Sequence, residues 1–171
     1  MTVRTLALFG LAFAATATLA ETSTLDSFHG LKFGMSLNDQ IHSCKVDTTP
    51  PCWDQMTTPH ESAYVINLTP EDQQLFTNEF VREVDGKVAY VALIFDLIKY
   101  PLVKQALNDK FGGGEPSKAE KGEYNWKPEG GTVNLFILNG DEGPYGDVEG
   151  ASNAYQQHID DEVAARQGKL E

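Results

Sequence analysis

The sequence has few of the residues on which most enzyme active sites depend. Among 171 residues there are two cysteines and four histidines. The chain contains no Gly-x-Ser-x-Gly turn, no phosphate-binding glycine loop, no His-Glu-x-x-His motif and no Rossmann fingerprint. These absences exclude the common hydrolase, nucleotide-binding and metalloprotease patterns. The sequence therefore predicts no catalytic residue, no cofactor and no metal site.

Basic side chains are also scarce. Lysine and arginine number 13 against 25 aspartates and glutamates, which gives a formal net charge of −12. Such a surface repels nucleic acid and anionic lipid, so neither is expected as a partner. A basic protein is a better electrostatic match. The alternative interpretation is that the acidity only confers solubility.

The one long hydrophobic run lies at the N-terminus. Arg4 precedes an apolar stretch over residues 6–15, and small residues follow as far as Ala20. This arrangement predicts a secretory signal peptide over residues 1–20. The run is shorter than the roughly 20 residues of a membrane helix, so no membrane insertion is expected after cleavage. We expect residues 21–171 to form a single domain, exported to a bacterial periplasm or secreted.

The two cysteines, Cys44 and Cys52, stand eight positions apart with two prolines between them. In an oxidising compartment they are expected to form a disulfide. Two alternatives are a metal site with His42 and His60, which flank the pair, and a catalytic thiol. Neither has the short ligand or Cys-x-x-Cys spacing typical of those sites.

Turn signals and hydrophobic periods predict an alternation of helices and hairpins. Asp85-Gly86 is the strongest hairpin signal in the chain, because this dipeptide favours a two-residue turn. A second hairpin is expected around Pro128, with Tyr124 and Trp126 on the same face as Val133. The expected helices cover residues 36–41, 101–111 and 153–167, and the expected strands cover residues 64–68, 75–84, 87–95, 124–126, 133–137 and 146–151.

This order predicts an α+β fold, an antiparallel sheet with helices packed on one face and a faint repeat of helix-plus-hairpin units. The stretches LKFGMSLNDQI and ALNDKFGGGEPSKAEKGEYNWKPEGGTVNLFIL resemble the helix, Gly-x-Pro and Trp-strand pattern of small bacterial envelope modules. Outer-membrane assembly lipoproteins of the SmpA/OmlA type and the secreted β-lactamase inhibitor protein contain such units. The resemblance implies a non-catalytic module that presents a sheet face to a partner.

The central hairpin suggests which face that is. If Val84 faces Lys87 across the Asp85-Gly86 turn and the register continues without a break, Phe80 faces Val91 and points inward. The opposite side would then carry an apolar patch with an acidic rim, formed by Glu79, Val81, Glu83, Tyr90 and Ile94. Exposed apolar patches of this kind often mark protein interfaces. The alternative is that the C-terminal segment covers the patch.

A second acidic cluster lies in the stretch NGDEGPYGDVEG and includes Asp141, Glu142 and Asp147. It is expected to be a mobile acidic loop that contacts a basic partner. Calcium is an alternative ligand, although the stretch lacks the ligand spacing of a calcium loop.

Together these features predict an exported periplasmic protein-binding module. Its most concrete form is an inhibitor or immunity protein that neutralises a basic enzyme or toxin, such as a cell-wall hydrolase. Charge complementarity would accelerate capture of the target, and a buried aromatic side chain would slow its release. Two alternatives remain: a structural factor for envelope assembly, and a hydrolase that uses two carboxylates brought together by the fold.

Overall fold

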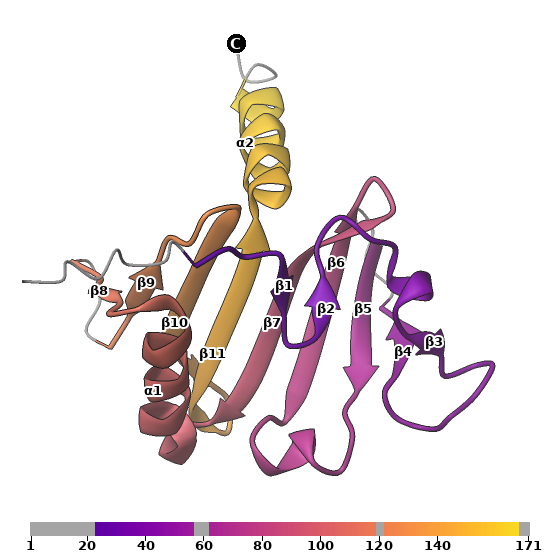
Figure 1. The fold of residues 1–171 in the computed structure, drawn as a ribbon, viewed down its shortest axis with the longest axis horizontal. Coiled ribbons are helices and arrows are strands. Elements are labelled where there is room, and N and C mark those ends of the chain that lie inside the picture. Colours follow the sequence, from indigo (N-terminus) through magenta and orange to yellow (C-terminus); the bar gives the residue numbers. More distant parts are fainter. Residues whose placement is uncertain (1–22, 57–61, 119–121, 168–171) are drawn as a thin grey trace, which may run out of the picture.

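The computed structural model describes residues 23–56, 62–118 and 122–167, and the predicted signal peptide lies outside these ranges (Figure 1). The strands are β1 (Ser27–Phe28), β2 (Leu31–Lys32), β3 (His42–Ser43), β4 (Cys52–Gln55), β5 (Ser62–Asn67), β6 (Asn78–Val84), β7 (Lys87–Asp96), β8 (Glu115–Pro116), β9 (Tyr124–Trp126), β10 (Gly131–Gly140) and β11 (Gly143–Ser152). The α-helices are α1 (Tyr100–Phe111) and α2 (Asn153–Gln167), and the 3-10 helices are η1 (Leu37–Asp39), η2 (Asp72–Gln74) and η3 (Leu97–Lys99). In the described residues, no helix is both long and apolar enough to span a membrane.

The main sheet has nine strands in the order β3-β4-β5-β6-β7-β11-β10-β9-β8. The predicted α+β class agrees with this sheet and two α-helices. All neighbouring strands are antiparallel except β3 and β4, which are parallel, so the sheet is mixed rather than purely antiparallel. A parallel pair normally needs a crossover of a dozen or more residues. Here each partner contributes only two residues to the pairing, and the Cys44–Cys52 disulfide closes the connection between them.

One face of the sheet is covered and carries the hydrophobic core. Helix α1 and the β1–β2 ribbon both lie on the near side of the sheet (Figure 1). The core contains Val81, Val91, Phe95, Val133 and Val148, all at most 1% exposed. We call this side the covered face.

The two α-helices behave differently. The apolar stripe predicted α1, and its Val103 and Leu107 are buried in the core. The bounds predicted for α2 are also correct, yet this helix buries none of its described residues. It extends beyond the end of the sheet (Figure 1). The prediction that helices pack on one face is thus met by α1 alone.

The helix predicted over residues 36–41 does not form. Its place is taken by η1, a single 3-10 turn whose Ser36 makes no side-chain capping bond. Leu37 is buried, and its backbone N–H donates to Glu83 Oε1 at 2.7 Å. The Glu83 carboxylate thus accepts from a backbone N–H at the start of the turn, the position at which a Ser36 side-chain cap was expected. The first of the two expected helix-plus-hairpin units consequently lacks its α-helix.

The structure confirms the disulfide between Cys44 and Cys52. Closing a loop of this length removes unfolded-state entropy worth about 2.5 kcal/mol. Reduction is therefore expected to lower the free energy of unfolding by about that amount in urea titrations. The double variant Cys44→Ala/Cys52→Ala should show the same loss and no further response to reductant. An unchanged midpoint on reduction would contradict the prediction.

Glycines in β11 make room for aromatic rings of the core. A Cβ atom added at Gly146 would lie 2.2 Å from Phe95 Cε2, and one at Gly150 would lie 2.5 Å from Phe28 Cγ. Both rings are buried. The strand expected over residues 146–151 thus extends to ten residues, and its glycines let the core approach the backbone.

Replacing Gly146 with alanine should displace Phe95 and lower the free energy of unfolding by about 2 kcal/mol. Urea denaturation followed by circular dichroism would measure the change. Gly113→Ala is the matched control, since nothing lies within 4 Å of the added Cβ. Equal stabilities of the two variants would mean that the Phe95 ring has room to move.

Candidate functional site

The register of the central hairpin breaks at a β-bulge. The turn is as predicted, with Val84 opposite Lys87, but the pairing shifts between Arg82 and Glu83. Phe80 consequently pairs with Ala92 instead of Val91. A bulge of this kind adds one residue to one strand and exchanges the faces of all residues beyond it.

The bulge lies beside a contact with the N-terminal segment. The backbone N–H of Val88 donates to the carbonyl of Met35 at 2.8 Å, and its carbonyl accepts from Gly34 N–H at 2.9 Å. The N-terminal segment thus forms hydrogen bonds with both backbone groups of Val88. Both Val88 and the neighbouring Ala89 are buried.

Three of the predicted contact residues therefore lie on the covered face. Val81 is fully buried and Glu79 is 3% exposed, so the prediction that they flank an exposed patch is wrong. Glu83 is half-buried and accepts hydrogen bonds from Leu37 N–H and from Tyr64 Oη–H at 2.9 Å. Glu83 anchors the N-terminal segment to the sheet instead of forming an acidic rim.

The opposite side of the sheet, which we call the open face, keeps Tyr90 and Ile94 and gains Phe80 and Arg82 from β6. Strand β11 adds Asp147, which pairs with Ile94, and Glu149, which pairs with Ala92. The start of α2 contacts this face at Tyr90, through the ring of Tyr155. Sequence reasoning missed Phe80 and Arg82 because the bulge leaves no local signal.

The acidic stretch predicted as a mobile loop is the β10–β11 hairpin. Asp141 and Glu142 form its two-residue turn and are exposed, whereas Asp147 lies within the sheet and is 7% exposed. The residues that the structure describes contain no group of three or more potential ligands that could hold a metal ion. The predicted acidic residues thus divide into an exposed pair at the hairpin tip and a buried carboxylate on the open face.

A hollow of about 240 Å³ lies on the open face beside Asp147. Its walls come from β5, β6, β7, β11 and the end of β4, and its lining residues are Met56, Ala63, Phe80, Val81, Arg82, Tyr90, Ala92, Ile94 and Asp147. The lining is largely apolar. Asp147 is the one carboxylate in it.

Asp147 is held in an unfavourable environment. Its Oδ1 atom is buried and accepts no hydrogen bond from the described residues. Burial raises the pKa of the carboxyl to about 7, and the nearby negative charge of Glu149 adds to the effect. Buried polar groups are usually satisfied, and unsatisfied ones often belong to functional sites.

The polar side chains at the far end of the hollow are already hydrogen-bonded within the protein. The Tyr90 hydroxyl donates a hydrogen bond to Glu149, and the centroid of the Tyr90 ring lies 4.8 Å from that of Tyr155 in α2. Arg82 lies over the Tyr90 ring and donates to the hydroxyl of Tyr155 at 3.1 Å. The start of α2 thus covers Tyr90 in part, as the alternative interpretation expected for the C-terminal segment. Ile94 and Asp147 lie further along the strands.

A second polar cluster lies on the covered face. His29 Nδ1 is 3.2 Å from Glu79 Oε2, and His29 Nε2 is 3.5 Å from Asp72 Oδ1. The first contact is an ion pair whose N–H is poorly aligned for a hydrogen bond. Desolvation lowers the pKa of His29, but the two carboxylates outweigh it and the pKa is raised. Both ring nitrogens face carboxylates, so this cluster fastens the β1–β2 ribbon to the sheet.

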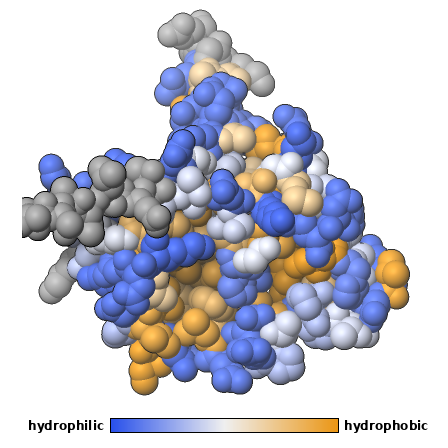
Figure 2. Space-filling view, viewed as in Figure 1, coloured by the Kyte–Doolittle hydropathy of each residue, from blue (hydrophilic) through white to orange (hydrophobic). Residues whose placement is uncertain are grey.

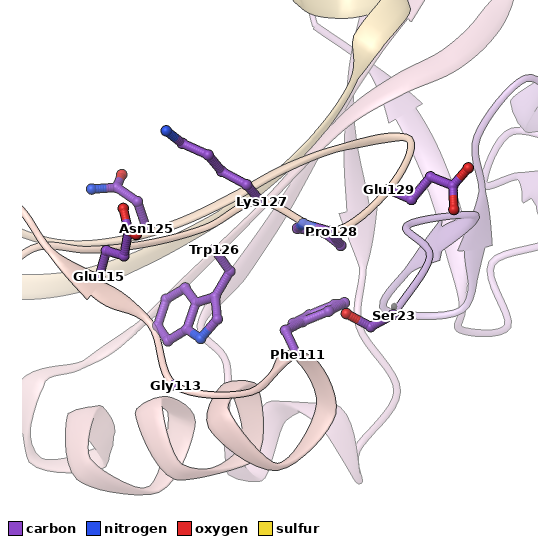
Figure 3. Close-up of a pocket in the computed structure, with 9 residues that line it drawn as sticks. All are labelled: Ser23, Phe111, Gly113, Glu115, Asn125, Trp126, Lys127, Pro128 and Glu129. Carbon is purple, nitrogen blue, oxygen red and sulfur yellow. The ribbon is translucent and has the colours of Figure 1, made fainter. Parts of the chain in front are cut away.

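A second hollow, of about 280 Å³, lies where α1 ends beside β9 (Figure 3). Trp126 and Phe111 project into it, while Lys127 points away. Trp126 Nε1 donates to the carbonyl of Gly112 at 2.8 Å, so the indole N–H is used within the fold. The described residues leave no unsatisfied side chain in this hollow, and the site has a packing role.

The covered face itself offers a less coherent surface. Polar and apolar side chains are interspersed on it, with an apolar area at the lower end of α1 (Figure 2). Ile98 and Leu102, in that segment, are 84% and 59% exposed. No buried charge accompanies them among the described residues.

The chain matches no protein-family model, and comparisons with curated proteins and with solved structures find none similar to it. The resemblance to small envelope modules therefore remains a prediction from the sequence.

Proposed function

We propose that the chain is an exported periplasmic protein-binding module that neutralises a basic enzyme or toxin, such as a cell-wall hydrolase. The observation that carries the proposal is the unpartnered Asp147 carboxylate beside an apolar hollow on the open face. A partner that supplies positive charge would satisfy this carboxylate and bury the apolar walls around it. The corrected contact set is Tyr90, Ile94 and Asp147 with Asp141 and Glu142 at the hairpin tip, while Glu79, Val81 and Glu83 no longer belong to it.

The remaining features support the same function. The formal charge of −12 favours association with a cationic partner and faster capture at low salt. The disulfide is compatible with an oxidising compartment. The nine-stranded sheet, with a disulfide at its β3–β4 edge, gives a rigid scaffold. A rigid scaffold reduces the entropy lost on binding.

A capture experiment tests the proposal. The mature protein, immobilised and exposed to periplasmic extract at about 20 mM salt, is expected to retain a cationic protein that about 0.5 M salt releases. The eluted protein should have an enzymatic or toxic activity that the module inhibits in solution. Recovery of nothing at low salt, or of a protein whose activity is unaffected, would contradict the proposal.

A pair of variants makes the capture specific to the open face. Asp147→Asn should reduce recovery about tenfold, because a charge-assisted contact in a desolvated site is lost. Asp109→Asn makes the same chemical change at an exposed position of α1 and should leave recovery unchanged. Equal losses in both variants would indicate attraction by net charge alone.

A further inference from the structure

We propose that the hollow beside Asp147 is a pocket for one lysine or arginine side chain of a basic partner protein. This inference rests on the proposed function and specifies how the open face would recognise its target. It places a single cationic group against the buried carboxylate and the alkyl part of the same side chain against the apolar walls.

The dimensions of the hollow suit a side chain better than a single water. Its volume of about 240 Å³ is several times the roughly 30 Å³ that one water occupies in the liquid. Phe80, Ile94 and Met56 supply apolar walls. Lysine and arginine stems pack along such walls while their charged ends reach a polar group.

The charges around the hollow favour a cation. Asp147 and Glu149 are both carboxylates, and the Tyr90 hydroxyl already donates its hydrogen bond to Glu149. Arg82 is the basic residue of the lining, and its Nη1 is bonded to Tyr155 at the opposite end. An anionic ligand would therefore be repelled by the Asp147 carboxylate, whereas a cation would offset its charge.

Two other occupants fit less well. A second copy of this chain would bring another strongly acidic surface to an acidic site, and like charges oppose such a contact. A metal ion would need several ligands, and the described residues offer no cluster of three that could hold one. A basic partner protein is the occupant whose charge complements the site.

The test uses small cationic probes on the full mature protein. N-acetyl-arginine amide and N-acetyl-lysine amide are titrated into ¹⁵N-labelled protein at pH 8, with N-acetyl-glutamine amide as the uncharged control. We expect saturable amide shifts centred on Ile94, Asp147 and Glu149, with a Kd on the order of 10 mM. Asp147→Asn, an isosteric change, should abolish the saturable shifts, while Asp109→Asn should retain them.

The pH dependence adds an independent readout. Around Asp147 lie the carboxylate of Glu149 on β11, the Tyr90 hydroxyl on β7, Arg82 on β6 and Tyr155 on α2. With a pKa of about 7, Asp147 is mostly protonated at pH 5.5, so the affinity should fall about tenfold or more from pH 8. Three results would contradict the proposed pocket: equal shifts with the glutamine probe, shifts that persist in Asp147→Asn, or no shifts at about 50 mM of a cationic probe.

The outcomes separate this inference from the proposed function. If the wild-type module captures and inhibits a cationic protein but the probes do not bind at Asp147, the pocket is wrong and the function stands. If the probes bind at Asp147 but no protein is captured, the pocket stands and the function is wrong.

Discussion

Replacing Asp147 with leucine is expected to raise the free energy of unfolding at pH 8.5 by about 3 kcal/mol. The wild-type carboxylate is 7% exposed, lacks a partner for Oδ1 among the described residues and faces Ile94 in the register. Leucine removes the buried charge and fills part of the neighbouring hollow. Urea denaturation of both proteins measures the difference.

The sign of this effect follows from the raised pKa. Asp147 titrates at about 7 in the folded protein and at 3.8 in an unstructured chain. The unfolded state therefore loses its proton first, and the stability of the wild type falls as the pH rises from about 4 to about 7. In Asp147→Asn and Asp147→Leu, the Asp147 contribution to this decrease of stability with pH should be absent. A wild-type stability that stays flat over this interval, after the His29 contribution is subtracted, would contradict the prediction.

Asp147→Leu should also weaken partner binding. Higher stability together with weaker binding is the informative result. A residue whose removal stabilises the free protein but abolishes capture is maintained for function and not for folding. Asp109→Asn, at an exposed position, is expected to change stability by less than about 0.5 kcal/mol. If a variant at Asp147 is stabilised and still captures the partner, Asp147 is not part of the binding site.

Replacing His29 with alanine is expected to lower the free energy of unfolding at pH 6 by about 3 kcal/mol. The substitution leaves Glu79, which is 3% exposed, without its ion-pair partner 3.2 Å away. It also removes the edge-to-face contact with Phe76, whose ring centroid lies 5.1 Å from that of His29. The β1–β2 ribbon should then separate from the sheet more easily.

The His29 effect should depend on pH in a defined direction. Because the folded-state pKa is raised, the ion pair contributes fully below the unfolded value of 6.5 and is lost as the pH rises through the folded value. The difference between wild type and His29→Ala should therefore narrow at high pH. His158→Ala is the control, since His158 is half-exposed and 3.9 Å from Glu162 on the surface of α2. A loss that is equal at pH 6 and pH 9 would mean that packing, and not charge, anchors the ribbon.

The local sequence signals that proved reliable involve few residues close together in the chain. Asp85-Gly86 forms the expected turn, with Val84 opposite Lys87. The second hairpin places Trp126 opposite Val133, as its loop length predicts. The bounds of α2 are those predicted, even though this helix buries none of its described residues. Local propensity and turn geometry are sufficient for such features.

The site could be predicted only in part. Tyr90, Ile94 and Asp147 do share a surface, but the sequence placed them beside Glu79 and Val81, which belong to the other face. The error came from one added residue in β7, and a single-residue shift exchanges the two faces of a strand. Asp147 was expected in the acidic loop and also falls within the strand expected over residues 146–151, and the structure places it in β11. The glycines on either side of it accommodate Phe95 and Phe28.

The sequence by itself determined the disulfide, the acidic charge, the Asp85-Gly86 turn and the helices α1 and α2, because each depends on composition or on neighbours within a few positions. Tertiary structure decided which residues face outward. Val88, beside the bulge, is hydrogen-bonded to the backbone of Gly34 and Met35, and rings from distant segments fill the space over Gly146 and Gly150. Contacts between residues so far apart in the chain have no local pattern, yet they put a buried, unpaired carboxylate on the open face.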